Sequence, residues 1–293
     1  MEDAIGTPQH RPPSTAGPEY PREETIERSF DRIVGEGRPR LQRLWPDMLA
    51  TGTVAGLEVG FGVLVLIITT KTTGSLALGG LAFSIGFIGL RLGHSELFTE
   101  GFLVPVTVVA AGEARVRDLM RLWVWTLVGN LGGGWLMALL IDTAFPSLRR
   151  QEILIGSYYV LSGVNMRSLA LGILAGGAIT LMTRMHSGTD SEMAKLLASV
   201  SMAFLIAGAR LFHSVLDSIL VFCALNTFHA PFGYLAWARF FGWAIVGNLA
   251  GGLGLTTLLR LVRSRRRLID HRAANHLPPV PKTAAALLTK RGN

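Results

Sequence analysis

Apolar segments close to the length of a membrane-spanning helix recur along this chain of 293 residues, and they constrain its fold more than any other feature. A helix needs about 20 apolar residues to cross a bilayer. The predicted spans cover residues 48–70, 76–111, 119–141, 166–183, 194–228 and 235–259. Hydrophobic residues make up 49% of the chain and charged residues only 16%, which agrees with an all-α membrane protein of six transmembrane helices.

The two ends of the chain differ from this apolar middle. Residues 1–44 are rich in Pro, Glu and Arg, so we expect a solvated, disordered arm with room for a short helix near residues 20–34. Residues 45–262 are the predicted transmembrane domain, and residues 263–293 are a basic tail. We expect no cleavable signal peptide.

Basic residues gather in the loops on one side of the predicted spans. That side carries Arg38, Arg40, Arg43, Arg115, Arg117, Arg121, Arg184, Lys195 and the run Arg260–Arg267, whereas the other side has mainly Lys71, Arg149 and Arg150. The positive-inside rule then places both termini in the cytoplasm and the chain in the inner membrane. We attribute the net charge of +8 to basic residues that orient the chain in the membrane and contact anionic lipid headgroups. No nucleic acid partner is expected.

Two sequence motifs occur twice. "RLGHSELF" at residues 91–98 is matched by "RLFHSVLD" at residues 210–217, an offset of 119. "LVGNLGGG" at residues 127–134 is matched by "IVGNLAGG" at residues 245–252, an offset of 118. The chain is therefore predicted to contain two homologous halves, residues 45–145 and 160–262, with three spans each. An odd number of spans inverts the second half relative to the first.

The second and fifth predicted spans are too long to be single helices. A continuous helix of 33 to 36 residues would measure about 50 Å, well beyond a hydrocarbon core of about 30 Å. We therefore predict a break in each, facing the protein interior, because unpaired backbone is not tolerated against lipid. Polar residues cluster at both places: His94, Ser95, Glu96, Thr99 and Glu100, then His213, Ser214, Asp217 and Ser218.

Small residues predict close helix packing around the breaks. Glycines recur at the four-residue spacing that lets helix backbones approach, for example Gly52 and Gly56, or Gly172 and Gly176. The single cysteine, Cys223, lies within the fifth span and is expected to be a packing residue. It excludes an internal disulfide, and no ATP-binding loop or other cofactor motif is present.

The element "ELFT" at residues 96–99, together with "HSV" at residues 213–215, resembles the formate/nitrite transporter family. The resemblance covers roughly residues 40–262. It implies an aquaporin-like fold, a homopentamer with a pore in every protomer, and transport of small monovalent anions or their conjugate acids. Formate, nitrite, hydrosulfide and lactate are family substrates, and family members are not enzymes.

The same resemblance assigns roles to individual residues. Leu97, Phe98 and Thr99 would form the loop that interrupts the second span, and Leu97 and Phe98 would narrow the pore. His213 would be the central pore histidine. Phe83 is a candidate for the outer constriction, and Glu96 is expected to hydrogen-bond backbone groups across the break.

The sequence also departs from the family pattern, which leaves the substrate open. His94 stands where a small residue is usual, Phe212 replaces a Glu, and Asp217 replaces an Asn. The Cys-Asn element of the fourth span is missing around "VNMRSLAL". These differences predict a divergent branch of the family.

The histidines suggest how charge is managed in an apolar path. Moving an isolated anion out of water costs many kcal/mol, whereas the neutral acid loses far less. Histidine can hold or donate a proton near neutral pH. His213 could thus attract the anion or supply a proton to it, and His94, its mate in the repeated motif, could be a second relay or could merely fill the break.

Arg91 and Arg210 each precede a motif histidine by three residues and have two interpretations. An intramembrane arginine could attract the anion. Alternatively, each could form a structural ion pair, Arg210 with Asp217 and Arg91 with Glu58. The structural interpretation is favoured.

Three other functions remain open at this stage. An intramembrane metalloenzyme could use His213 and Asp217, with His94, Glu96 and Glu100 as further ligands. An accessory membrane protein could keep the fold without conducting, because Phe212 and the arginines could plug the path. A neutral-solute channel is the third, and the basic motifs make it less attractive than an anion path.

Overall fold

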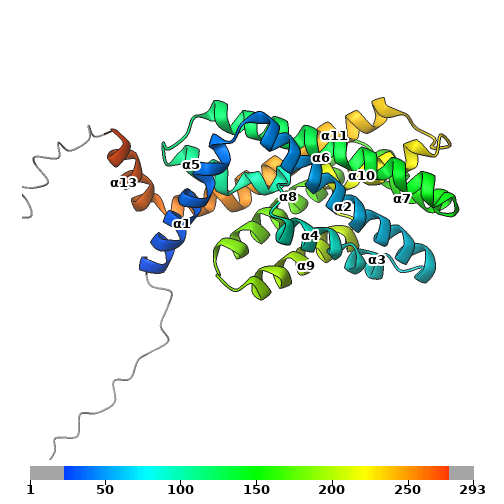
Figure 1. Cartoon of the computed structure of the whole chain (residues 1–293), viewed down its shortest axis with the longest axis horizontal. Coiled ribbons are helices and arrows are strands. Elements are labelled where there is room, and N and C mark those ends of the chain that lie inside the picture. Colours follow the sequence, from blue (N-terminus) through cyan, green and yellow to red (C-terminus); the bar gives the residue numbers. More distant parts are fainter. Residues whose placement is uncertain (1–22, 277–293) are drawn as a thin grey trace, which may run out of the picture.

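Four unbroken helices form the frame of the bundle. In the computed structural model, which describes residues 23–276, these are α2 (Trp45–Thr73), α6 (Val116–Ala144), α8 (Met166–Ser187) and α11 (Tyr234–Leu249). The described residues form helices and no strand. α2 packs along α6, and α8 packs along α11 (Figure 1). The frame therefore consists of two helix pairs, one from each half of the chain.

The second and fifth predicted spans are broken, as expected. In the first half, α3 (Leu76–Ala82) and α4 (Ser84–Gly93) are followed by extended residues, then by the 3₁₀ turn η1 (Phe98–Phe102) and α5 (Val104–Ala110). In the second half, α9 (Glu192–Gly208) is separated from α10 (Ser214–Asn226) by a non-helical segment. The arrangement confirms that the second and the fifth predicted span are interrupted.

The number of times the chain crosses the membrane does not follow directly from the helices. Five described helical segments are long and apolar enough to span a membrane, namely Trp45–Thr73, Leu76–Gly93, Val116–Ala144, Met166–Ser187 and Tyr234–Arg263. Phe98–Ala110 and Ser214–Asn226 are apolar but shorter, and α9 has 17 residues. The count of six crossings stays a prediction, because it requires each broken segment to count as one span.

Each half also begins with a helix that lies outside the predicted spans. After the short turn η2 (Pro146–Leu148), helix α7 (Arg149–Leu161) packs against α10. In the first half, α1 (Glu23–Gln42) packs against α5 in the corresponding way. The two helices lie at opposite ends of the bundle (Figure 1). The repeat is therefore larger than three spans and includes a capping helix.

The prediction of a disordered arm over residues 1–44 is wrong for the part that the structure describes. Helix α1 extends well beyond the short helix expected near residues 20–34, and Phe30, Ile33, Val34 and Leu41 are buried in it. An apolar stripe at helical spacing packs onto the bundle instead of remaining solvated. Residues 1–22 lie outside the described part.

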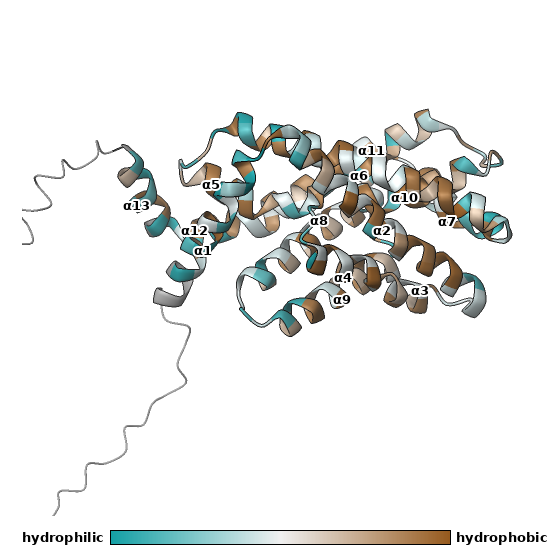
Figure 2. Cartoon of the chain, viewed as in Figure 1, coloured by the Kyte–Doolittle hydropathy of each residue, from teal (hydrophilic) through white to brown (hydrophobic). Residues whose placement is uncertain are grey.

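The basic tail is likewise partly folded. Helix α11 continues through a π-helical segment, η3 (Ala250–Leu258), into α12 (Leu259–Arg263), which is followed by α13 (Arg265–His276). Helix α13 is joined to α1 by Arg267 and Asp31, whose Nε and Oδ1 atoms are 3.0 Å apart. In Figure 2 this end is largely hydrophilic, whereas the middle of the bundle is hydrophobic. Residues 277–293 lie outside the described part.

Glycines bring the paired helices into backbone contact, as the four-residue spacing predicted. A Cβ added at Gly56 would meet the carbonyl oxygen of Asn130, and one added at Gly176 would meet that of Asn248. The two contacts occupy the same place in the two halves. Tight packing is therefore part of the repeat itself.

Replacing Gly176 with Ala is expected to destabilise the folded protein, because the new Cβ would clash with the backbone of α11. Overpacking of this kind costs about 1–3 kcal/mol. Gly132 is the control, because it is exposed on α6 and no atom lies within 4 Å of an added Cβ. Gly132→Ala should raise stability slightly. The measurement is the temperature at which half of the detergent-solubilised protein leaves its main size-exclusion peak, and equal temperatures for both variants would contradict the prediction.

The docking of α13 on α1 is expected to weaken as the pH rises above about 6.5. His271 Nδ1 lies 2.7 Å from Glu113 Oε1 and its Nε2 lies 3.0 Å from Asp31 Oδ1, so both ring nitrogens face carboxylates. Burial alone would lower the pKa of His271, but these hydrogen bonds outweigh burial and raise it. A raised pKa stabilises the folded state at low pH, and this contribution is lost as the pH rises through the raised value.

Hydrogen–deuterium exchange of residues 265–276 between pH 6 and pH 8, corrected for intrinsic rates, measures this effect. The other charged groups facing the cluster are the guanidinium groups of Arg267 of α13 and Arg38 of α1. His271→Gln should give exchange that no longer depends on pH. The same pH dependence in both proteins would contradict the role of His271.

Candidate functional site

The first helix break is held by one side chain, Asn130 of α6. Its Oδ1 accepts a hydrogen bond from the backbone N–H of Phe98 at 2.8 Å. Its Nδ2 donates to the carbonyl oxygens of Gly52 and Glu96, at 2.8 and 2.9 Å. Asn130 is fully buried. It therefore supplies partners that the backbone loses where the helix is interrupted.

The second break is held in the same way by Asn248 of α11. Its Oδ1 accepts from the N–H of Ser214 at 2.9 Å. Its Nδ2 donates to the carbonyl oxygens of Gly172 and Phe212, at 2.9 and 2.7 Å. We call these two sets of contacts the asparagine bridges. Each joins the first and third helices of its half to the broken helix between them.

The asparagine bridges define which residues of the two breaks are equivalent. Glu96 corresponds to Phe212, and Phe98 corresponds to Ser214, so the structural offset is 116 residues. The repeated Arg-Leu-x-His-Ser motif has an offset of 119 instead. The motif marks both breaks correctly but aligns them three residues out of register.

The backbone φ angles support the same offset of 116 residues between the two breaks. His94 and Arg210, which are equivalent in the structural register, both have positive φ angles, 53° and 50°. His94 is therefore not the structural counterpart of His213, contrary to the sequence interpretation. Leu97 occupies the corresponding place in the first half. The buried histidine is thus a feature of the second break alone.

His213 caps α10 and reaches the other half of the protein. Its Nδ1 accepts a hydrogen bond from the N–H of Leu216 at 3.1 Å, and Asp217 Oδ2 accepts from the N–H of His213 at 2.7 Å. Its Nε2 lies 2.9 Å from Oγ1 of Thr99. His213, Thr99 and Asp217 are all fully buried. The two breaks therefore meet at the Thr99–His213 contact.

These contacts fix the tautomer of the neutral imidazole. Because Nδ1 accepts from a backbone N–H, it carries no proton, and the ring proton must be on Nε2. Nε2–H then donates to the hydroxyl of Thr99. A second proton could bind only at Nδ1, where it would displace the Leu216 N–H and disturb the cap of α10.

Aromatic and aliphatic side chains surround the first break. Leu97 and Phe98 are buried. The Phe98 ring packs edge-on against Phe102, with centroids 5.1 Å apart, and against Trp123 at 6.0 Å. Phe83 is also fully buried, at the junction of α3 and α4. Whether these residues line a path remains a prediction.

The second break is enclosed by a separate aromatic cluster. The ring of Phe212 lies 5.6 Å from Tyr159, 5.6 Å from Phe240 and 6.1 Å from Tyr158. The guanidinium of Arg210 stacks over Tyr158 at 4.6 Å. The hypothesis that Arg210 pairs with Asp217 is therefore wrong in this structure, because a cation–π contact holds Arg210 instead.

Next to the first break lies a polar cavity of about 330 Å³, which we call the vestibule. Its basic side chains are Arg40, Arg43, Arg91 and Lys195, and its acidic ones are Glu36, Glu96 and Glu100. Glu96 Oε1 accepts hydrogen bonds from Arg40 and Arg43, each at 2.8 Å. Glu96 was expected to bond backbone groups across the break. It instead binds α1 and the α1–α2 turn to the loop, and Asn130 bridges the backbone.

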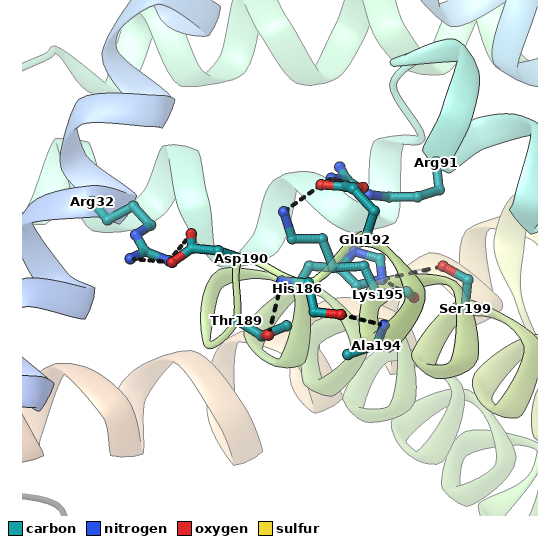
Figure 3. Close-up of polar contacts among 10 residues, drawn as sticks. Arg32, Arg91, His186, Thr189, Asp190, Glu192, Ala194, Lys195 and Ser199 are labelled. Atoms are coloured by element: carbon teal, nitrogen blue, oxygen red, sulfur yellow. Dashed lines mark hydrogen bonds and ion pairs between the residues drawn. The ribbon is translucent and has the colours of Figure 1, made fainter.

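Arg91, Lys195 and His186, which also line the vestibule, form the paired contacts shown in Figure 3. Arg91 and Lys195 both bind Glu192, at 2.8 and 2.7 Å. His186 Nε2 lies 3.1 Å from both the carbonyl oxygen of Lys195 and the hydroxyl of Ser199. His94 is exposed and lines the vestibule, away from His213. The vestibule is polar and nearly balanced in charge.

Arg91 therefore forms a structural ion pair, although with a different partner from the one proposed. Glu58 of α2 pairs with the hydroxyl of Ser95 instead. The Arg91–Glu192 bond ties α4 to α9, two helices that pack against each other. Glu192 lies 101 residues further along the chain, so the sequence offered no local sign of this pair.

The structure does not bring together the metal ligands that the metalloenzyme hypothesis proposed. It required His94, Glu96 and Glu100 to approach His213 and Asp217. The first three line the vestibule, whereas His213 is enclosed between the breaks. Residues 23–276 contain no cluster of three or more His, Cys, Asp or Glu side chains with the geometry to hold a metal ion. Cys223 is buried and unpaired by disulfide.

Comparisons with known proteins agree with this architecture. Residues 27–262 match the formate/nitrite transporter family. The chain is 26% identical over 258 residues to the inner membrane protein YfdC of Escherichia coli (strain K12), covering 83% of this chain and 80% of that protein. An FNT family ion channel matches with a TM-score of 0.69 at 19% identity, over 82% of this chain and 98% of its own. A pentameric formate channel with formate bound matches with a TM-score of 0.65 at 18% identity, over 74% and 96%.

Two inverted halves with interrupted middle helices define a membrane channel or transporter of the aquaporin-like type. The family match spans most of the chain, and the chain belongs to the formate/nitrite transporter family. It is accordingly a transport protein and not an enzyme. The apolar helices and the inner-membrane relative identify it as a multi-pass protein of the inner membrane.

Replacing Asn130 or Asn248 with Leu is expected to destabilise the protein by a similar amount in each case. Each substitution leaves three backbone groups without their partner. A buried group without a partner costs about 1–3 kcal/mol. Thr143→Val is the control, because Thr143 is exposed and bonds only within its own helix. Thermal unfolding in detergent measures the difference, and a loss at only one asparagine would contradict the equivalence of the two bridges.

Proposed function

We propose that the chain conducts small monovalent anions, or their conjugate acids, along a path that passes between the two helix breaks in each protomer. The observation that carries the proposal is the 2.9 Å contact between Thr99 Oγ1 and His213 Nε2, at a fully buried point where the two halves meet. Family membership and the formate bound in a similar channel support formate or a related anion as the substrate.

The hydrogen bonds of His213 suggest how it assists passage. A bare anion would lose its hydration between the breaks at a cost of many kcal/mol. The Thr99 hydroxyl accepts from the Nε2–H of His213, and its own O–H could then donate to the anion and replace part of that hydration. Because a second proton on Nδ1 would disturb the α10 cap, the proton that neutralises the substrate is proposed to travel with it, and His213 to remain neutral.

We further propose that the protein is a homopentamer with both termini in the cytoplasm. The assembly is supported by the pentameric channel of similar fold. The orientation is supported by the basic residues at the end of the bundle where α1 and α13 lie. The vestibule beside the first break would then open toward the cytoplasm, and Leu97, Phe98 and Phe83 would be the residues that narrow the path.

A non-conducting accessory protein is the second candidate, and one observation favours it. Phe212, where the family pattern has an acid, lies buried in a cluster with Tyr158, Tyr159 and Phe240. Packed rings at the second break could close the path. Absence of flux for every anion, from protein shown to be folded and oligomeric, would select this candidate.

Flux in proteoliposomes tests the proposal, with formate, nitrite, hydrosulfide and chloride measured by stopped flow from pH 5 to 8. Uptake of one weak-acid anion should rise with acidity, and chloride, whose acid is strong, should not follow. His213→Asn should abolish most flux but keep stability, since Asn is a good N-cap and can still accept from Leu216. His213→Ala should lose flux and also about 1 kcal/mol of stability. Undiminished flux in His213→Asn would refute the role of Nε2.

A further inference from the structure

A groove with a volume of about 760 Å³ lies between α8, α9 and the continuous helix made of η3 and α12. It is separate from the vestibule, whose lining it does not share. Leu174 and Leu181 of α8, Leu205 of α9, and Leu255 and Leu259 form its apolar walls, and all five side chains are exposed at the protein surface. Within a membrane these walls face lipid or a neighbouring protein.

The small residues of α8 and the π-helix shape this groove. Gly177 and Ala178 line it, and an added Cβ at Gly177 would meet only Leu255, at 3.9 Å, and the Gly251 carbonyl, at 4.0 Å. The opposite wall begins in η3, where the wider π turn displaces the side chains from an ordinary helical pattern. Small side chains on α8 therefore leave space between the two walls.

Three arginines stand at one end of the groove: Arg184 of α8, and Arg260 and Arg263 of α12. The groove lining contains no carboxylate, and no ion pair found within residues 23–276 involves these three side chains. Arg260 Nη2 donates to Ser29 of α1 at 2.8 Å, while its Nε is buried without an acceptor. Like charges so placed repel one another unless an anion lies among them.

We propose that this groove binds an anionic phospholipid, whose phosphate accepts hydrogen bonds from the three arginines and whose acyl chain lies against the leucine walls. Guanidinium groups match phosphate oxygens in geometry and charge. Ser29 places the basic end beside α1, on the side of the bundle expected to face the cytoplasm, where anionic lipids attract basic residues. The binding does not depend on which anion the protein conducts.

The test compares the intact protein with Arg260→Gln/Arg263→Gln in mixed micelles that contain either phosphatidylglycerol or phosphatidylcholine. Native mass spectrometry counts the lipids that remain bound, and size-exclusion after heating gives the melting temperature. The wild type should retain phosphatidylglycerol at least about fivefold more than the variant and should melt higher with it than with phosphatidylcholine. That fivefold ratio corresponds to about 1 kcal/mol of binding free energy.

Two further variants separate the parts of the site. Arg117→Gln/Arg150→Gln removes the same charge from exposed positions elsewhere and should retain phosphatidylglycerol like the wild type. Gly177→Leu fills the groove without changing any charge and should release the lipid. Inorganic phosphate added to phosphatidylcholine micelles should not raise the melting temperature, because it lacks the acyl chain.

Three results would overturn the proposal. Equal retention of phosphatidylglycerol by the wild type and Arg260→Gln/Arg263→Gln would exclude the arginines as the headgroup site. Stabilisation by inorganic phosphate alone would indicate a simple anion site. Dissociation of the oligomer in Gly177→Leu, with lipid retention unchanged in the arginine variant, would show that a second copy of the chain occupies the groove.

Discussion

The architecture depends on satisfying backbone groups where two helices stop inside the membrane. Lipid offers no hydrogen bonds, so an interrupted helix persists only if protein groups replace the missing partners. Asn130 and Asn248 do this with one amide each, accepting from one N–H and donating to two carbonyls. An amide is suited to this task because it is donor and acceptor at once and carries no charge. Glycines beside each bridge let the helices approach closely enough for it to form.

The two halves share this framework but differ in what surrounds it. At the first break the equivalent position is Glu96, held by two arginines beside a polar vestibule. At the second it is Phe212, enclosed by rings. A repeated scaffold thus presents a charged, polar side and an apolar side, and the Thr99–His213 contact joins the two breaks. The two halves share the framework, and individual side chains give its two faces different chemistry.

The sequence predicted the repeat, the breaks and the close helix packing because each leaves a local or periodic pattern. It did not predict the register in which the two helix breaks are equivalent. That register is set by the hydrogen bonds of Asn130 and Asn248, whereas aligning the repeated Arg-Leu-x-His-Ser motif gives a register that differs by three residues. The repeated "VGN" contains both asparagines and is the signal of these bridges in the sequence, although by itself it indicates only that the chain repeats. Ion pairs were missed for another reason: Arg40 reaches Glu96 and Arg91 reaches Glu192 across large sequence separations. Helix α1 was misjudged because its polar composition concealed an apolar stripe.

The position of His213 at the N-terminus of α10 constrains the charge that the site can hold. The N-terminal end of a helix carries partial positive charge, which favours an anion nearby and disfavours a cation. An imidazolium there would oppose this field and lose the Leu216 hydrogen bond, whereas the neutral ring keeps the bond and turns Nε2–H toward Thr99. A neutral His213 therefore adds no formal charge to this helix end, where the carboxyl group of Asp217 already accepts the His213 N–H. If an anion passes here, a neutral donor would hold it less strongly than an arginine would, and weak binding is what rapid passage requires.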